Sequence, residues 1–404
     1  MNIKKGFILI ISISMSKKNN PSLFAVYHSW LMQIHLDKDI FQIPTLFKTV
    51  YNTNSYIVWY FRDKELTDFD KICPWLKTIK LKNRWGWGMY DNAINIDIIR
   101  YLIFNSKKID IINLSHIIKT NILYGFIYKF FNPRGKIYIK MDFDYTAHKK
   151  ETTFRTKYKF LNIFVDRMFN KFLSICDCIS VETKEWYDFL IDLNHRFKDN
   201  LVYMPNGYND TYINKYVWHI KTYEEKENII VTVWRIWTHQ KNTEMLLETL
   251  KDTNLKDWKV YIIWPIEDEF QNYIDNFFEN NQKLKEKIIF TWPIYDRDKL
   301  YDFYNRAKIF CLTSRYESFG IVMVEAMSFW DYIITTDVSS AKDITDNNNI
   351  WKIIKDWKDF KNTLSEIIED ESIIKNKYGN IIRYARENFA WSKIIKIVGK
   401  KLWF

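Results

Sequence analysis

The sequence is short of glycine, with nine glycines in 404 residues, about a third of what an average usage of roughly 7% would give. Cysteine is scarce too, and Cys73, Cys176, Cys178 and Cys311 form no CxxC pair. This excludes a disulfide framework and indicates a reduced, cytoplasmic protein. The seven histidines form no HExxH pattern, and no apolar run is long enough to span a bilayer.

What the chain does contain is typical of a globular protein of two domains. Hydrophobic residues make up 47% and charged residues 27%, and the length exceeds that of one ordinary core. The net charge of +11 would suit nucleic acid, an anionic membrane or phosphorylated substrates. Because the basic residues are dispersed and no nucleic-acid motif occurs, we expect no nucleic-acid partner. The start, MNIKKGFILIISISMSKKNN, resembles a signal peptide without a cleavage site, and we interpret residues 6–14 as a first buried strand.

Apolar runs alternate with amphipathic stretches along the whole chain, which predicts an α/β fold with parallel sheets. The predicted strands are short and rich in Ile, Val and Tyr: SYIVWYF, IDIINLSH, KIYIKMDFD and CISVET in the first half, then NIIVTVWRI, KVYIIWPI, KIIFTWPI, KIFCLTS and DYIITTD. Helices are predicted between them, among them residues 120–131, 159–173, 242–253 and 321–329.

A domain boundary is predicted at MPNGYND, where a Pro-Asn-Gly turn opens a polar stretch before a new strand. We therefore expect Rossmann-like domains at 1–207 and 208–390, with a C-terminal helix at about 391–404 that could pack back on the first. Ligands of such sheets bind outside the carboxyl ends of the strands. The cleft between the two sheets is the expected site.

The segment SRYESFGIVMVEAMSF combines several groups that suit a phosphate ligand. Glu317 precedes a helix opened by Gly320, and Glu325 lies within that helix. A helix N-terminus offers free N–H groups and partial positive charge, and glycine allows close approach. Arg235 and Lys241 flank the loop after the first strand of this domain, and two cations at one strand end suit a diphosphate.

These residues resemble the GT-B retaining glycosyltransferases of the group 1 type, relatives of glycogen synthase. The resemblance rests on two glutamates separated by seven residues in ESFGIVMVE, on the loop RIWTHQK, on YNRAKIFCLTSRYESFG, on MPNGYND and on FAWSKI. It is specific over roughly residues 203–395 and topological before them. It implies a fold of two Rossmann-like domains facing across a cleft.

The resemblance also implies the roles of the matching residues. Glu325 would hold the ribose of a UDP- or GDP-sugar, Glu317 would lie beside the donor sugar, and Arg235 and Lys241 would stabilise the leaving diphosphate without a metal or other cofactor. Further donor-binding positions are assigned around the same loops: Trp234, Trp237, Pro293, Ser318, Phe319, Gly320 and Ile321.

The first domain is expected to bind a glycan, lipid-linked or other acceptor. His116, at the end of IDIINLSH, is either near the acceptor or a structural histidine. The segment YGFIYKFFNPRGKIYIK could touch the inner face of a membrane or be an ordinary helix and strand. Asp142 and Asp144 form a DxD pattern, but it lies far from the donor signature, and we expect no metal there.

Tryptophan stands where glycine is usual, and the 17 tryptophans would together with the nine glycines restore a normal glycine fraction. The positions concerned end strands or helices or lie in the phosphate loop: Trp234, Trp237, Trp264, Trp292 and Trp330, with Trp85 and Trp87 as further cases. Rings at 234 and 237 would fill the ligand's space. We hypothesise that UGA codons for glycine have been read as tryptophan. The alternative is genuine aromatic turns that stack on sugars.

Two other functions share these sequence features. One is a protein that binds a nucleotide sugar without turnover, and the other is a sugar-nucleotide epimerase of the same fold. The presence of Glu317, Arg235 and Lys241 together favours a retaining hexosyltransferase, that is, an enzyme of glycan biosynthesis.

Overall fold

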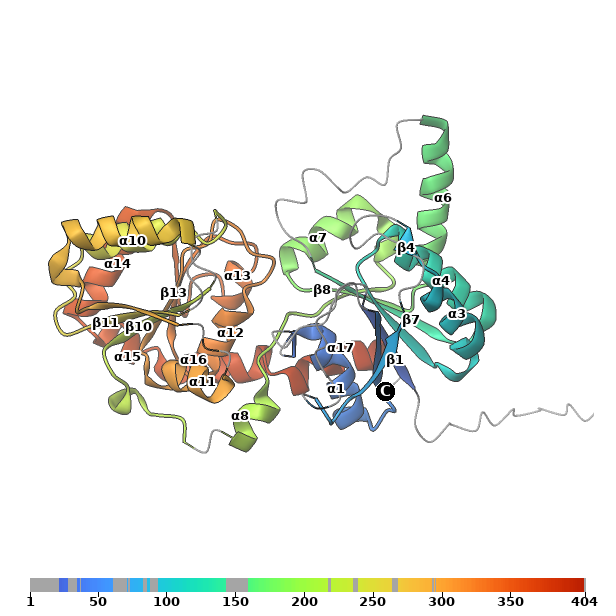
Figure 1. The fold of residues 1–404 in the computed structure, drawn as a ribbon, viewed down its shortest axis with the longest axis horizontal. Coiled ribbons are helices and arrows are strands. Elements are labelled where there is room, and N and C mark those ends of the chain that lie inside the picture. The colour runs from blue at the N-terminus through green and yellow to red at the C-terminus, as the bar shows by residue number, and fades with distance from the viewer. Residues whose placement is uncertain are drawn as a thin grey trace, which may run out of the picture.

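The computed structural model of the protein describes residues 22–27, 35–36, 38–60, 71, 73–82, 86–87, 94–142, 159–216, 219–234, 239–263, 268–292, 294, 296 and 297–402. Two α/β domains lie side by side, and each is built around a parallel sheet (Figure 1). This confirms the predicted GT-B fold class.

The N-terminal domain contains a seven-stranded sheet in the order β3-β2-β1-β6-β7-β8-β9, and all of its pairs are parallel. Its strands are β1 (Leu23–Tyr27), β2 (Tyr56–Tyr60), β3 (Lys77–Leu81), β6 (Ile111–Ser115), β7 (Lys136–Met141), β8 (Cys178–Val181) and β9 (Leu201–Tyr203). A short antiparallel pair joins β4 (Gly86–Trp87) to β5 (Ile94–Asn95). β6 to β8 are buried almost throughout, because helices cover both faces of the sheet.

The helices of this domain alternate with the strands: α1 (Asp39–Tyr51), α3 (Ile96–Asn105), α4 (Lys119–Phe131), α6 (Lys159–Ile175) and α7 (Lys184–Leu193). Several begin at side chains that cap free N–H groups. Asn95 accepts from the N–H groups of Asp97 and Ile98, and Thr183 accepts from that of Trp186. The cap at Thr183 fixes the start of α7 directly after β8.

The expected first strand at residues 6–14 lies outside the described residues. The strand at the centre of the sheet, between β2 and β6, is β1 at Leu23–Tyr27. The sequence analysis missed it because the longer apolar run at residues 6–14 predicts the first strand there. β3, β9 and β15 were missed too: β3 reads KTIKL, with two lysines and no continuous apolar run, and β9 and β15 are three residues long.

The C-terminal domain contains a six-stranded parallel sheet in the order β12-β11-β10-β13-β14-β15. Its strands are β10 (Ile229–Val233), β11 (Lys259–Ile263), β12 (Ile288–Thr291), β13 (Ile309–Leu312), β14 (Tyr332–Thr336) and β15 (Lys352–Ile354). Its helices are α9 (Thr243–Lys251), α10 (Asp268–Asn280), α11 (Arg297–Arg306), α12 (Ile321–Ser328), α13 (Ala341–Ile344), α14 (Trp357–Glu369), α15 (Ser372–Lys375) and α16 (Tyr378–Asn388). The order reverses between β10 and β13, which places a switch point, and hence a natural ligand crevice, at these strands.

The chain crosses between the domains twice, at α8 (Asp210–Tyr216) and before α17 (Trp391–Lys401), and α17 packs on α1 in the N-terminal domain (Figure 1). The two crossings touch: the N–H of Tyr208 donates to the carbonyl of Phe389. A Cβ on Gly207 would lie 2.6 Å from that carbonyl oxygen. Glycine is therefore required where the crossings meet.

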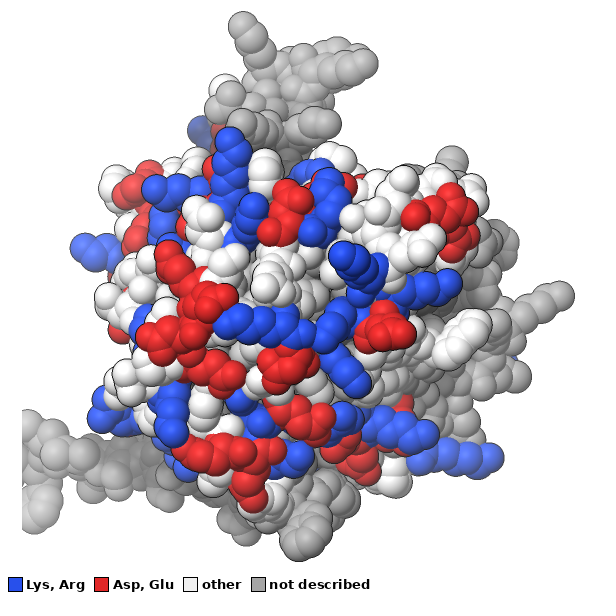
Figure 2. Space-filling view, turned by 90° about the vertical axis from the view of Figure 1, so that its left-hand side faces the viewer, with Lys and Arg blue, Asp and Glu red and all other residues white. Residues whose placement is uncertain are grey.

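Charge on the face drawn in Figure 2 is mixed, with Lys and Arg beside Asp and Glu. No one sign dominates that face. Among the described residues, no helix is long and apolar enough to cross a membrane.

Candidate active site

The loop from β13 to α12 lies at the carboxyl end of the central strand of the C-terminal sheet. It ends at Gly320, whose φ of 75° lies in the left-handed region that favours glycine. Gly320 is the N-cap of α12, and its carbonyl accepts a hydrogen bond from the N–H of Met323 at 2.9 Å. The N–H groups of Ile321 and Val322 precede that bond at the start of the helix. The anion site expected here stays a prediction.

Lys241 and Glu317 form an ion pair in this loop region. The ammonium of Lys241 donates to Oε1 of Glu317, the hydroxyl of Ser314 donates to the same oxygen at 2.7 Å, and Gln240 approaches Oε2 at 3.4 Å. Glu317 is 6% exposed. Three donors therefore fix a nearly buried carboxylate beside the start of α12.

Glu325 lies on α12 and faces α11. Its Oε1 is 3.5 Å from Nη1 of Arg297. Burial raises the pKa of Glu325, and the charge of Arg297 opposes that rise. Arg297 is a site residue that the sequence analysis missed, because a helix-initial arginine gives no signal until α11 and α12 are seen to pack together.

The other predicted positions of this loop differ in what they expose. Ser318 and Ile321 are partly accessible, whereas the ring of Phe319 is buried in the domain core, 6.3 Å from the ring of Phe389. Phe319 can therefore offer only backbone atoms to a ligand. Its carbonyl already accepts a hydrogen bond from Ser340.

One expectation about the tryptophans is wrong. The ring of Trp234 points into the core, is 4% exposed and donates to Oγ1 of Thr243 at 3.2 Å, so it does not fill ligand space. It is the last residue described before the phosphate loop and continues the inward-facing pattern of β10. Trp292 is 89% exposed after β12.

Trp330 has the backbone conformation of a glycine. Its φ is 77°, and it follows Phe329, the C-cap of α12. This left-handed position after a helix is most often occupied by glycine, because a Cβ there is strained. Arg235, Trp237, Trp264, Trp85 and Pro293 lie outside the described residues, and only the backbone of Trp87 is described.

The N-terminal domain faces this loop with the ends of β6 and β7. His116, which follows β6, has a φ of 64°, and its Nδ1 accepts from the N–H of Asp142 at 3.4 Å. His116 therefore supports the backbone at the end of β7, and its expected place near the acceptor stays a prediction.

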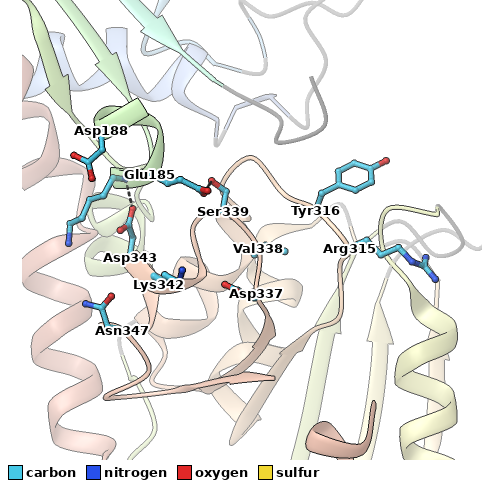
Figure 3. Close-up of a pocket in the computed structure, with 11 residues that line it drawn as sticks. Glu185, Asp188, Arg315, Tyr316, Asp337, Val338, Ser339, Lys342, Asp343 and Asn347 are labelled. Carbon is cyan, nitrogen blue, oxygen red and sulfur yellow. Dashed lines mark hydrogen bonds between the residues drawn. The ribbon is translucent and has the colours of Figure 1, made fainter. Parts of the chain in front are cut away.

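A polar pocket of about 420 Å³ lies between the domains (Figure 3). Its N-terminal wall is the start of α7, and its other wall is formed by the C-terminal residues 337–347 with Arg315 and Tyr316. The N–H of Lys184 donates to Asp343 at 2.8 Å across the junction, drawn as the dashed line. The sequence analysis missed this pocket because its walls come from segments that are far apart in the chain.

The segment YGFIYKFFNPRGKIYIK is mostly core. Tyr124 and Tyr128 are fully buried, and Lys136–Met141 is strand β7. Phe130 is 79% exposed, but it lies at the C-terminal end of α4, on the side of the sheet opposite the strand carboxyl ends. Most of the segment therefore packs in the core, and its expected role toward an acceptor or a membrane stays a prediction.

Within the part of the chain that the structure describes, no group of three His, Cys, Asp or Glu side chains is arranged to hold a metal ion. Asp142 is described, and its neighbours are Lys140, Glu182 and Ser318. Asp144, the second carboxylate of the DxD pattern, lies outside the described residues.

Comparison with known proteins finds a family model that matches most of the C-terminal domain. Residues 218–388 match the family model Glycosyl transferases group 1. A probable sucrose-phosphate synthase of Thermosipho melanesiensis is 24% identical over 272 residues, which cover 63% of this chain and 62% of that relative, so the chain spans less than two thirds of it.

Solved structures share the fold across nearly the whole chain. HepE of Anabaena, in complex with UDP and glucose, superposes with a TM-score of 0.67 at 13% identity and covers 95% of this chain and 99% of its own. The galactosyltransferase WaaB of the lipopolysaccharide outer core, in its apo form, has a TM-score of 0.64 at 14% identity, covering 95% and 99%. Sucrose-phosphate synthase of Thermosynechococcus elongatus has a TM-score of 0.63 at 14% identity, covering 94% and 98%.

Proposed function

We propose that this chain, a GT-B fold protein whose second domain matches the glycosyl transferases of group 1, moves a sugar from a nucleoside diphosphate to an acceptor and retains the anomeric configuration. The observation that carries the proposal is the pairing of Lys241 with Glu317 at the Gly320-opened start of α12. It places a cation, a carboxylate and free N–H groups together at a switch point of a parallel sheet.

Each group would serve one part of the donor. The ammonium of Lys241 and the N–H groups of α12 would stabilise charge on the departing diphosphate, and Arg235 would add a second cation. Glu325 would accept hydrogen bonds from the ribose. Glu317 would lie beside the sugar, where an acceptor hydroxyl would attack on the face that the diphosphate leaves. No metal is required for this charge stabilisation.

The acceptor would be rich in hydroxyl groups. The pocket of Figure 3 is lined by amide and hydroxyl side chains and by charged side chains of both signs, among them Asp188, Asp337, Asn347, Lys342 and Arg315, with Val338 as its aliphatic member. Such groups bind sugar hydroxyls and suit an acyl chain poorly. This supports the glycan end of an acceptor as the part that enters the pocket.

Peripheral contact with the inner face of a membrane is a separate proposal. Its support is a surface formed by the exposed rings of Phe104 and Phe130 with the exposed Lys107 and Lys108. Aromatic rings and lysines suit an anionic interface. Sedimentation with anionic and with neutral vesicles tests it, and equal recovery in both would contradict it.

The test of the donor site is binding of UDP and of GDP to two versions of the protein. One is the sequence as written, and the other has glycine at positions 237, 264, 292 and 330. We expect the glycine version to bind one of them more tightly, followed by release of that nucleotide from the matching nucleotide sugar when acceptor is added. Folded protein that binds neither nucleotide would overturn the proposal, and binding without turnover would favour a nucleotide-sugar-binding protein.

A further inference from the structure

Two loops of the C-terminal domain are hydrogen-bonded to one another at the carboxyl ends of β10 and β13. One, which we call the cation loop, is residues 239–242 before α9, and the other, the acid loop, is residues 313–317 after β13. The N–H of Arg315 donates to the carbonyl of Gln240 at 2.7 Å. The guanidinium of the same residue donates through Nη1 to the carbonyl of His239 at 2.6 Å. One residue of the acid loop thus holds two successive carbonyl groups of the cation loop.

The remaining carbonyl groups of the cation loop meet the same partner. Oγ1 of Thr313 lies 3.2 Å from the carbonyl oxygen of Lys241 and 3.2 Å from that of Asn242. In the opposite direction, Nε2 of Gln240 donates to the carbonyl of Tyr316 at 3.0 Å. Every carbonyl oxygen of the cation loop therefore lies within hydrogen-bond distance of a donor in the acid loop.

The cation loop depends on this support because its own backbone is strained. Asn242, the N-cap of α9, has a φ of 52°, and its side chain does not cap the helix. This left-handed region is sparsely populated by residues other than glycine. A strained backbone persists where the surrounding contacts fix it. The direction in which Lys241 leaves the backbone is therefore set by the acid loop.

The guanidinium of Arg315 is the charged donor in this set of bonds. Arg315 lines the interdomain pocket, but its side chain points away from the other side chains drawn there (Figure 3). A bond from a charged donor is stronger than one between neutral groups. Its acceptor is the backbone carbonyl of His239, so it leaves the ion pair of Lys241 with Glu317 intact.

We propose that Arg315 is a positioning residue for the donor site: it holds the cation loop against the acid loop, so that the ammonium of Lys241 stays beside Glu317 at the start of α12. Gln240 fixes the same junction from the other side. The inference rests on the proposed function, because it concerns how Lys241 meets a diphosphate. Arg315 is given no contact with the substrate and acts through the backbone next to Lys241.

A double-variant cycle tests whether Arg315 acts through Lys241. Arg315→Ala loses the guanidinium bond and keeps the backbone N–H, so it should raise the Kd for UDP or GDP about fivefold in a calorimetric titration. In a Lys241→Ala background the same substitution should raise the Kd less than about twofold, because the residue that it positions is gone. An equal factor in both backgrounds would overturn the proposal.

Two further variants separate positioning from a general loss of charge or structure. The bond to His239 uses one N–H group, so the ammonium of Arg315→Lys can replace it and should restore the Kd to within about twofold of wild type. A Kd as high as that of Arg315→Ala would contradict the role of this bond. Arg383→Ala is the matched control, an exposed arginine of α16 that donates to Oδ1 of Asn380 at 3.1 Å, and it should leave the Kd unchanged.

Hydrogen exchange tests the same junction without a ligand. Once the guanidinium bond is lost, the two loops should separate more often, so peptides from residues 239–245 and 313–319 should exchange faster in Arg315→Ala, with α14 unchanged. Gln240→Ala should do the same and serves if Arg315→Ala does not fold. Exchange equal to that of wild type would overturn the proposal. If wild type binds neither nucleotide, the proposed function fails, while exchange still decides whether Arg315 holds the loop.

Discussion

Lys241 donates its ammonium hydrogen bond to Glu317, so the cation and the carboxylate expected at the donor site neutralise one another in the free protein. Both side chains are largely buried, at 14% and 8% exposure. A diphosphate must therefore compete with Glu317 for Lys241. The contributions of Lys241 and Glu317 to nucleotide binding can therefore be measured separately by substituting each residue in turn.

Lys241→Ala should weaken nucleotide binding. Losing a hydrogen bond to a charged group costs about 2 kcal/mol, which is roughly a 30-fold higher Kd for the diphosphate. Calorimetric titration with UDP and GDP measures it. Lys251→Ala is the control, because Lys251 forms a similar pair with Glu248 at the far end of α9; equal loss in both would argue against a phosphate role.

Glu317→Gln should have the opposite effect on binding. Without the competing carboxylate, Lys241 is free for phosphate, so nucleotide affinity should stay level or rise while kcat falls. A binding isotherm measures the nucleotide affinity, and steady-state kinetics measures kcat. A parallel loss of affinity and kcat would show that Glu317 mainly supports the loop.

Nucleotide binding should strengthen as the pH rises through the pKa of Glu325. Burial raises that pKa, and only the ionised carboxylate accepts both ribose hydroxyls. Kd measured across acidic to neutral pH should therefore fall in wild type. The matched variant Glu325→Gln should show weaker binding with a flat pH dependence, and a slope equal to that of wild type would rule the assignment out.

The buried pair of Lys226 and Asp331 should dominate the stability of the C-terminal domain. Both side chains are fully buried, 2.7 Å apart, and Lys226 also donates to the carbonyl of Tyr304. Lys226→Met leaves a buried carboxyl group without its partner and should cost about 3–5 kcal/mol. Chemical denaturation measures it, and a double variant that also carries Asp331→Asn should recover part of the loss.

The same pair predicts a pH dependence of stability. Burial, opposed by Lys226, raises the pKa of Asp331 to about 7. An acid with a raised folded-state pKa contributes stability that is full below its ordinary pKa and is lost as the pH rises through about 7. Asp331→Asn should remove this decline from the unfolding free energy, and an identical decline in the variant would assign it elsewhere.

Trp330→Gly should be tolerated, although it removes a large ring. Relief of the left-handed backbone is worth roughly 1–2 kcal/mol, and it offsets the lost edge contact with Tyr378, worth about 0.5–1.5 kcal/mol. Trp258→Gly is the control: Trp258 is 1% exposed in the core and should cost about 3–5 kcal/mol. Similar losses at both positions would count against glycine at 330.

The natural residue at position 330 can also be identified directly. Peptide mass spectrometry of protein from its own source should find glycine at 330 and tryptophan at 258, and UGA and UGG codons should stand at the respective positions. Tryptophan at both would remove the recoding hypothesis and leave Trp330 as a strained aromatic turn.

Several features could be predicted because they depend on local physical chemistry. Buried parallel strands need apolar, β-branched runs, and β6, β7, β10 and β13 follow from theirs. The helix that Gly320 opens was predicted from its sequence, and the structure adds that Gly320 has a positive φ. The anomaly at Trp330 was also visible in the sequence. The position just after a helix often has a left-handed backbone, which favours glycine, so a tryptophan there is unusual.

The sequence by itself determined the two-sheet architecture and the loop that begins α12, because residue period and backbone preference act over a few neighbours. Only the tertiary structure decided that Arg297 meets Glu325, that the Trp234 ring turns inward, and that Glu182 and Lys140 form a buried pair. These relationships join strand ends and helices far apart in the chain. Whether a charge is buried, paired or protonated depends on which of those segments the fold brings together.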